Sequence, residues 1–421
     1  MFYWPIALAT TGNVIHSGMP LRPALILIAL AIAAPGGASW DSPARKRRAA
    51  APPSTHKPRT KSHRSRGLKT RAASPAKAAP TKLLAPGRWR PDVAEAVEQA
   101  MAAKGRDTEE YSSADPPVAA FAYEDVAVTG SIAESLFYRL VSRAEFKFSE
   151  TFWAQVPAQY GAARIRAAYD NFRTQPRSAW PNDPYYRIYR KGFFRCQESV
   201  CLHWGAKRCA EWRVRLLVGF PEVELRPYIK ATLEEEFQRP VGQETVEEFS
   251  GDPSPVRVRV GLRRITEMED LFFRLKDRGF DVWVLSDAYQ WAAEEFAKEY
   301  GVHPTRVLAI RAKVSDGGVL TEETLIPVPK GAGRAEAVAM FIGRPPVLAC
   351  GDIGDLSLLD YGRGLRVLFV EQKDADSPPP RGRKWLIQSR FSPERAPQET
   401  GHPVLPMSGG EGGEAAVGQP E

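Results

Sequence analysis

Short apolar runs alternate with amphipathic stretches between residues 255 and 370, and this alternation constrains the fold more than any other feature. The expected strands are 280–285, 306–311, 346–350 and 365–370, and the expected helices are 264–278, 288–300, 333–341 and 355–361. Upstream, an apolar run at 117–123 precedes Gly130 and a helical pattern at 132–141. Strands that are each followed by a helix are typical of a mostly parallel sheet with helices on both faces. The sequence therefore predicts a doubly wound, Rossmann-like α/β core.

Within the region 1–38, residues 19–38 have the pattern of a secretory signal peptide, whereas residues 1–18 fit no leader pattern. Arg22 precedes an apolar run at 24–34, Ala38 offers a cleavage site, and Met19 is a candidate for the true start. The run is short for a membrane span. We therefore expect an exported protein, periplasmic or extracellular, with an uncleaved N-terminal membrane anchor as the alternative.

Residues 39–90 form a basic segment with fifteen Lys or Arg and one acidic residue, whereas the rest of the chain is more acidic than basic. Such a segment lacks the large apolar side chains needed to fold, so we expect a disordered linker there and a disordered tail at 391–421. The linker is either a spacer or a contact to an anionic membrane or envelope polymer. The charge distribution does not indicate a specific nucleic-acid partner.

Residues 91–145 and 255–390 are expected to form the core, and the aromatic-rich residues 146–254 a helical domain inserted between them. Aromatic residues in such an insertion either pack its own interior or line a ligand pocket. Within it, Cys196, Cys201 and Cys209 lie close to His203. This cluster allows one disulfide with a leftover thiol, three free thiols, or a metal site.

Four short stretches lie where the predicted strands end or helices begin. They are Phe121-Ala122-Tyr123-Glu124-Asp125-Val126 with Gly130-Ser131, Val282-Trp283-Val284-Leu285-Ser286, Gly331-Ala332-Gly333-Arg334 and Gly351-Asp352-Ile353-Gly354-Asp355. In order and position they resemble motifs I to IV of the haloacid-dehalogenase-like phosphatases, nearest to the phosphoserine-phosphatase-like branch. The resemblance covers roughly residues 115–375 and implies that residues 146–254 are a cap over the site.

The resemblance assigns a role to each position, and motif I departs from the family's pattern. The family's nucleophilic aspartate is replaced by Ala122, while Glu124 falls at the position of the general acid. Further roles are phosphoryl binding by Ser286, charge neutralisation by Arg334 or Lys330, anion binding at the helix start near Gly130, and Mg²⁺ binding by Asp352 and Asp355. Without the nucleophile, aspartyl-phosphate chemistry is lost.

Three functions follow as hypotheses. The first is an exported phosphatase-like protein with impaired catalysis that retains binding of a phosphorylated small molecule or another anionic ligand. The second is an active Mg²⁺-dependent phosphomonoesterase that uses Asp125 or Glu124, since Asp125 begins an Asp-x-Ala-x-Thr pattern similar to that of the phosphonate-cleaving branch. The third is a non-enzymatic envelope adaptor.

Overall fold

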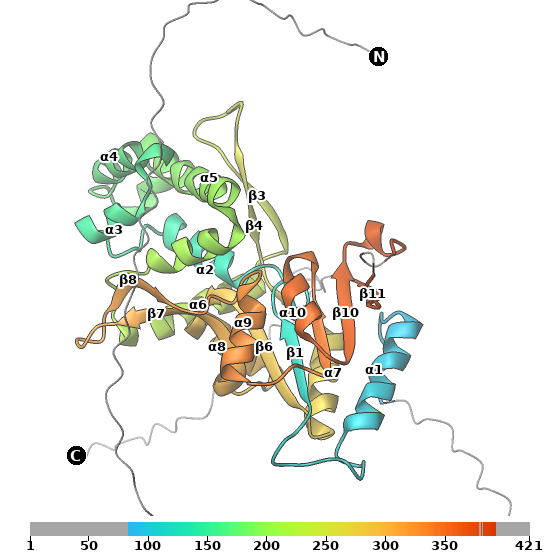
Figure 1. The fold of residues 1–421 in the computed structure, drawn as a ribbon. Helices are drawn as coiled ribbons and strands as arrows, with labels where there is room; N and C mark the ends of the chain where they lie inside the picture. The colour runs from blue at the N-terminus through green and yellow to red at the C-terminus, as the bar shows by residue number, and fades with distance from the viewer. Residues whose placement is uncertain (1–82, 379, 381, 393–421) are drawn as a thin grey trace, which may run out of the picture. The chain divides into compact units, whose positions relative to one another are not determined.

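A seven-stranded, mostly parallel sheet forms the centre of the protein in the computed structural model, which describes residues 83–378, 380 and 382–392 (Figure 1). Its strand order is β11-β10-β9-β1-β6-β7-β8, and only the β7–β8 pair is antiparallel. The strands are β1 (Val118–Ala122), β6 (Asp281–Tyr289), β7 (Val307–Val314), β8 (Leu320–Leu325), β9 (Leu348–Gly351), β10 (Leu365–Val370) and β11 (Leu386–Ser389). The predicted α/β class is confirmed.

Helices cover both faces of this sheet. Successive strand residues point to opposite sides, and apolar side chains on both sides are buried by helices. On one face, Ala119 and Phe121 of β1 pack in a core shared with α1 (Pro91–Lys104), α7 (Thr266–Asp277) and α8 (Gln290–Ala297). On the other face, Ala120 packs in a second core with α9 (Gly333–Phe341) and α10 (Leu356–Tyr361). The fold is therefore doubly wound, as the sequence predicted.

The central strand β1 places the first motif at one edge of the sheet. It lies between β6 and β9, so the carboxyl ends of these three parallel strands are neighbours. A loop and the short strand β2 (Val128–Thr129), which pairs with β5 (Arg263–Arg264), lead from β1 into α2 (Ile132–Ser142). The four motif stretches consequently meet at the carboxyl edge of the sheet, the arrangement that the haloacid-dehalogenase-like resemblance implies.

Residues 146–254 form a helical insertion between α2 and the second half of the core (Figure 1). Its main helices are α3 (Glu150–Gln155), α4 (Ala162–Phe172), α5 (Pro184–Arg215) and α6 (Glu222–Gln238). Gly205 interrupts α5 with φ of 82°, and the disulfide between Cys201 and Cys209 spans this kink while Cys196 stays free. Among the described residues, no cluster of metal-binding side chains is present.

The structure corrects three predicted boundaries. Phe391, assigned to the disordered tail 391–421, is buried and packs against Trp89. Residues 256–260, which the sequence assigned to the core as part of 255–390, form β4 (Val256–Val260). This strand pairs with β3 (Gly242–Val246), so the insertion continues past residue 254. Residues 83–90, assigned to the disordered linker, pack against the core. Leu84 is buried, and the guanidinium of Arg88 donates to Glu267 through Nε at 2.7 Å and Nη2 at 2.8 Å.

The remaining N-terminal predictions lie outside the described residues. These are the signal peptide of residues 1–38 and the linker up to residue 82, and the same holds for the tail from residue 393 onward. Within the described part of the chain, none of the helices has the length and apolar character needed to cross a membrane.

Candidate functional site

The position of the missing nucleophile lies at the carboxyl end of β1. Ala122 is fully buried beside Leu285 of β6, and its methyl group offers no atom for covalent catalysis or metal binding. The chain then turns sharply, because the carbonyl of Tyr123 accepts hydrogen bonds from the amides of Ala127 and Val128 at 2.9 and 3.0 Å. This tight turn directs the side chains of the next two acidic residues in different directions.

Glu124 points to the end of the neighbouring strand β6. Its Oε1 accepts a short hydrogen bond from the Ser286 hydroxyl, and Ser286 Oγ in turn accepts from the amide of Ala288 at 3.1 Å. Ser286 is fully buried. The hydroxyl that the sequence assigned to a phosphoryl group therefore already has a donor and an acceptor partner within the protein.

Arg334 lies at the start of α9 and is almost completely buried, with 1% of its surface exposed. Its Nη1 lies 2.6 Å from Asp355 Oδ1, its Nη2 lies 3.6 Å from Glu124 Oε2, and its Nε donates to the carbonyl of Pro329 at 3.2 Å. A buried guanidinium requires such partners, since an unpaired buried charge is strongly destabilising. Arg334 thus connects motifs I, III and IV.

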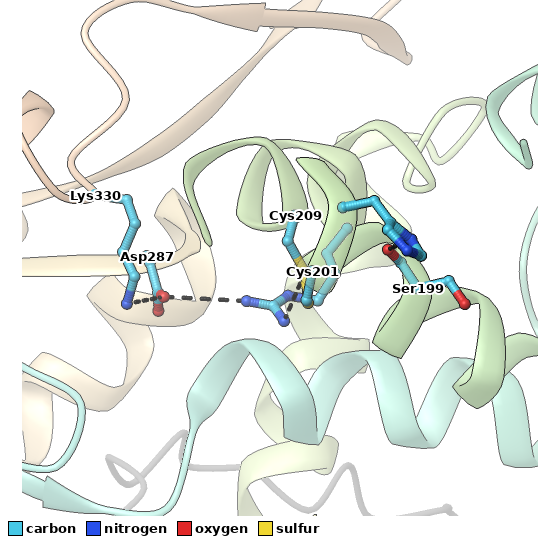
Figure 2. Close-up of a disulfide and its surroundings, with 7 residues drawn as sticks. Ser199, Cys201, Cys209, Asp287 and Lys330 are labelled. Carbon is cyan, nitrogen blue, oxygen red and sulfur yellow. Dashed lines mark hydrogen bonds and ion pairs between the residues drawn. A yellow bond between two sulfur atoms is a disulfide. The ribbon is translucent and has the colours of Figure 1, made fainter. Parts of the chain in front are cut away.

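Asp287 completes the buried part of the site, although it lies at none of the four motif positions. Its Oδ2 lies 2.7 Å from Lys330 Nζ, a contact visible in Figure 2, and 4.0 Å from Nη2 of Arg213 on α5 of the insertion. Arg213 also reaches the disulfide sulfur of Cys209 at 3.8 Å. A carboxylate directly after Ser286, at the end of the apolar run 282–285, was the sequence signal that could have identified it.

Asp125 points away from Ser286 and toward a second group of arginines. The residue has φ of 59°, in the left-handed region that aspartate tolerates better than most residues. Its Oδ1 accepts from Arg259 Nη2 at 2.6 Å, and its Oδ2 lies 3.6 Å from Arg390 Nη1. The carboxylate proposed as an alternative nucleophile is therefore held by two guanidinium groups.

The motif IV aspartates form a capping box at the end of β9. Asp352 Oδ1 accepts from the amide of Gly354 at 2.7 Å, and Asp355 Oδ2 accepts from the amide of Asp352 at 2.9 Å. The second oxygen of Asp352 accepts from Arg390 Nη2 at 2.8 Å. Both carboxylates assigned to Mg²⁺ therefore have an arginine partner.

Gly130 and Ser131, at the start of α2, are explained by local backbone geometry and helix capping. Gly130 has φ of 100°, and a Cβ at this position would lie 2.5 Å from the carbonyl oxygen of Gly261. Ser131 caps α2, its hydroxyl accepting from the amide of Glu134 at 3.2 Å. Close backbone packing and helix capping explain both residues without a bound anion.

Burial and neighbouring charges shift the acidity of three carboxyl groups. Burial and the negative charge of Asp287 raise the pKa of Glu124 to about 7, against the opposing effect of Arg334. Burial likewise raises the pKa of Asp355 to about 6, although Arg334 lowers it. For Asp287, burial is outweighed by Lys330, Arg213 and Arg334, and its pKa falls below the usual range.

The residues present do not fit a magnesium ion. The position that the resemblance assigns to the nucleophilic aspartate is occupied by Ala122, which has no oxygen ligand to offer, and Mg²⁺ needs several oxygen ligands in near-octahedral geometry. Asp352 and Asp355 are available only if Arg390 and Arg334 leave them. As it stands, this arrangement is a network of ion pairs that joins the loops at the carboxyl edge of the sheet.

The structure thus divides the predicted site residues into two groups. Glu124, Ser286, Arg334 and Asp355 meet in the interior, with Lys330 beside them through Asp287. Asp125 and Asp352 share Arg390 nearer the surface. The arginines that bind the second group come from β4 and from the segment after β11, and no motif spacing in the sequence pointed to them.

Comparison with known proteins supports the fold only. No family model and no curated protein matches the sequence. A solved protein of unknown function from Anaerococcus prevotii aligns with a TM-score of 0.63 and 17% identity, over 75% of this chain and 100% of its own. A haloacid-dehalogenase-family hydrolase from Salmonella enterica serovar Typhi (TM-score 0.32, 11% identity, 60% of this chain and 64% of its own) also matches. A cytosolic 5'-nucleotidase IIIB bound to cytidine matches as well (TM-score 0.35, 12% identity, 69% of this chain and 83% of its own). Scores this low carry no argument about activity.

Proposed function

We propose that this protein is a phosphatase-like protein that has lost phosphoryl-transfer activity. The observation that carries the proposal is Ala122 at the end of β1, with the nearby carboxylates already paired to arginine and lysine side chains. Removing the nucleophile of such a site costs on the order of 10⁴-fold or more in rate. Asp125 and Glu124 are poor replacements because each is held by hydrogen bonds or ion pairs within the protein.

An assay with an aryl phosphate and Mg²⁺ tests this proposal. We expect no turnover above background from the wild-type chain. We also expect none from Ala122→Asp alone, because Asp352 remains bound to Arg390. Hydrolysis by the wild type that is abolished by EDTA would overturn the proposal. Its loss in Asp125→Asn or Glu124→Gln would then identify the residue responsible.

The proposal also includes retained binding of an anionic ligand. Lys330 and Arg334 would have to release Asp287 and Asp355 before they could hold a phosphoryl group. Inorganic phosphate that raises the melting temperature of the wild type, but not of Lys330→Gln, would support a retained anion site. Without that rise, the anion-binding part of the proposal fails.

A groove on the insertion side favours a second candidate, the envelope adaptor. It has a volume of about 720 Å³ and is lined by α2, α5 and β4, with apolar walls that include Phe137, Phe194 and Val258. Leu202 at this groove is 78% exposed. A partner that is retained by the wild type and by Leu325→Glu, but lost by Leu202→Glu, would favour this function.

We also propose that the chain is exported through residues 19–38. The disulfide between Cys201 and Cys209 supports this, because disulfides persist in oxidising compartments. Intact-mass measurement of the protein from a periplasmic fraction tests the proposal. A mass that begins after Ala38 is expected, whereas a mass that includes the leader favours the anchored alternative.

A further inference from the structure

Arg390 joins carboxylates from three separate loops. Its Nη2 donates to Asp352 after β9 at 2.8 Å, and its Nη1 donates to Glu371 after β10 at 2.6 Å. The same Nη1 lies 3.6 Å from Asp125 in the loop after β1. One cation that contacts carboxylates of three loops links these loops, as a bound divalent ion links its ligands in a metal site.

Arg334 has the equivalent position in the interior. It contacts Asp355 and Glu124 through different nitrogens of one planar guanidinium, at 2.6 and 3.6 Å. The guanidinium stays protonated at any pH at which the protein is folded, so its charge is permanent. A metal ion could reach these carboxylates only by displacing a buried cation.

We propose that Arg334 and Arg390 are fixed internal cations that replace a divalent metal ion at the motif IV carboxylates. The chain then holds its loops together without Mg²⁺ and binds none at this edge of the sheet. Mg²⁺ gives up its hydration water reluctantly, which adds to the cost of displacing the arginines. This inference goes beyond the loss of catalysis, since a protein without a nucleophile can still bind metal.

Titration with Mn²⁺, followed by the loss of its free-ion electron paramagnetic resonance signal, tests the inference directly. The full chain should show no Mn²⁺ binding that is sensitive to Asp352→Asn. In Arg390→Ala, Asp352 and Asp125 lose their shared cation, and we expect Mn²⁺ binding to appear that is abolished when Asp352→Asn is added. Arg390 is partly exposed, so this variant should fold.

Arg383→Ala is the matched control. Arg383 lies in the same C-terminal part of the chain and donates to Asp360 through two nitrogens at 2.8 and 2.7 Å, but it does not contact motif IV. We expect its Mn²⁺ titration to match that of the wild type. A gain in this variant equal to that of Arg390→Ala would overturn the inference.

Two further outcomes would also overturn it. The first is wild-type Mn²⁺ binding that disappears in Asp352→Asn, because the carboxylate would then bind metal with its arginine present. The second is a folded Arg390→Ala that gains no Mn²⁺ binding relative to the wild type, since the arginine would then not be replacing a metal. If Arg390→Ala does not fold, the wild-type and Asp352→Asn titrations decide the question alone. None of these results depends on phosphatase activity, so they are separable from the proposed function.

Discussion

The helical insertion and the motif loops are stabilised by different kinds of contact. In the insertion, buried rings pack directly, with centroid distances of 5.0 Å for Phe146 and Phe152 and 5.0 Å for Tyr189 and Phe193. At the motif loops, buried carboxylates pair with arginine and lysine. Apolar packing tolerates variation in position, whereas a buried charge depends on a specific partner. The difference indicates that the motif loops depend on charge balance, whereas the insertion depends on apolar packing.

The largest expected effect is on the insertion. Phe193→Ala should lower the free energy of unfolding by about 3–5 kcal/mol, because the ring is fully buried among other aromatic side chains. Urea unfolding followed by circular dichroism measures the change. Tyr185→Ala on the same helix, where 45% of the residue is exposed, is the control and should change stability much less. A loss below about 1 kcal/mol for Phe193→Ala would contradict tight packing of the insertion.

A smaller effect, dependent on pH, is expected at the motif loops. The pKa of Glu124 is about 7 in the folded chain, compared with 4.5 for the same side chain in the unfolded chain. Folded Glu124 therefore holds its proton more tightly, and its contribution to stability is full below pH 4.5 and is lost as the pH rises through 7. Glu124→Gln should remove this loss, which is on the order of 1–3 kcal/mol.

Urea midpoints of the wild type and of Glu124→Gln between pH 4.5 and 8 measure this contribution. The wild type should lose more stability over this range than the variant, and Asp355 accounts for part of the remaining slope because its pKa is raised to about 6. Glu336→Gln, an exposed position on α9, should keep the wild-type slope. If the urea midpoints of the wild type and Glu124→Gln change equally with pH, ionisation of Glu124 does not lower the free energy of unfolding.

The smallest effect is expected for an ion pair on the surface of the insertion. Arg166 and Glu150 are both well exposed, and water screens such pairs. Arg166→Ala should leave the urea midpoint unchanged within error. A clear loss of stability would mean that the insertion also depends on its ion pairs, and the contrast with the motif loops would weaken.

The sequence predicted the strands and helices of the core well because hydrophobic periodicity is a local signal. Helix α9 and strand β10 have the predicted bounds. The strands β8 and β11 were missed, because both are short edge strands with few apolar residues. Residues 256–260 were assigned to the core but pair with β3 of the insertion, since alternation between valine and arginine does not specify a pairing partner.

The site was predictable only where motif order identified the residues. Glu124, Ser286, Arg334 and Asp355 end the expected strands or begin the expected helices, and they do meet. Arg259 and Arg390 were not predicted, because each contacts its carboxylate from a distant part of the chain and follows no motif. Non-local ion pairs of this kind become visible only once the chain is folded.

The contacts of residues 83–90 determine how mechanical force would enter the domain. Arg88 donates to the carbonyl of Ser392 at 2.6 Å, and the ring of Trp89 lies 4.9 Å from that of Phe391. Tension on the chain ahead of residue 83 would load the contacts of residues 83–85 with Glu98 and Asp270 first, and the segment after β11 next. Arg390 lies in that segment, so a pull strong enough to detach it would also separate the motif IV loop from its cation.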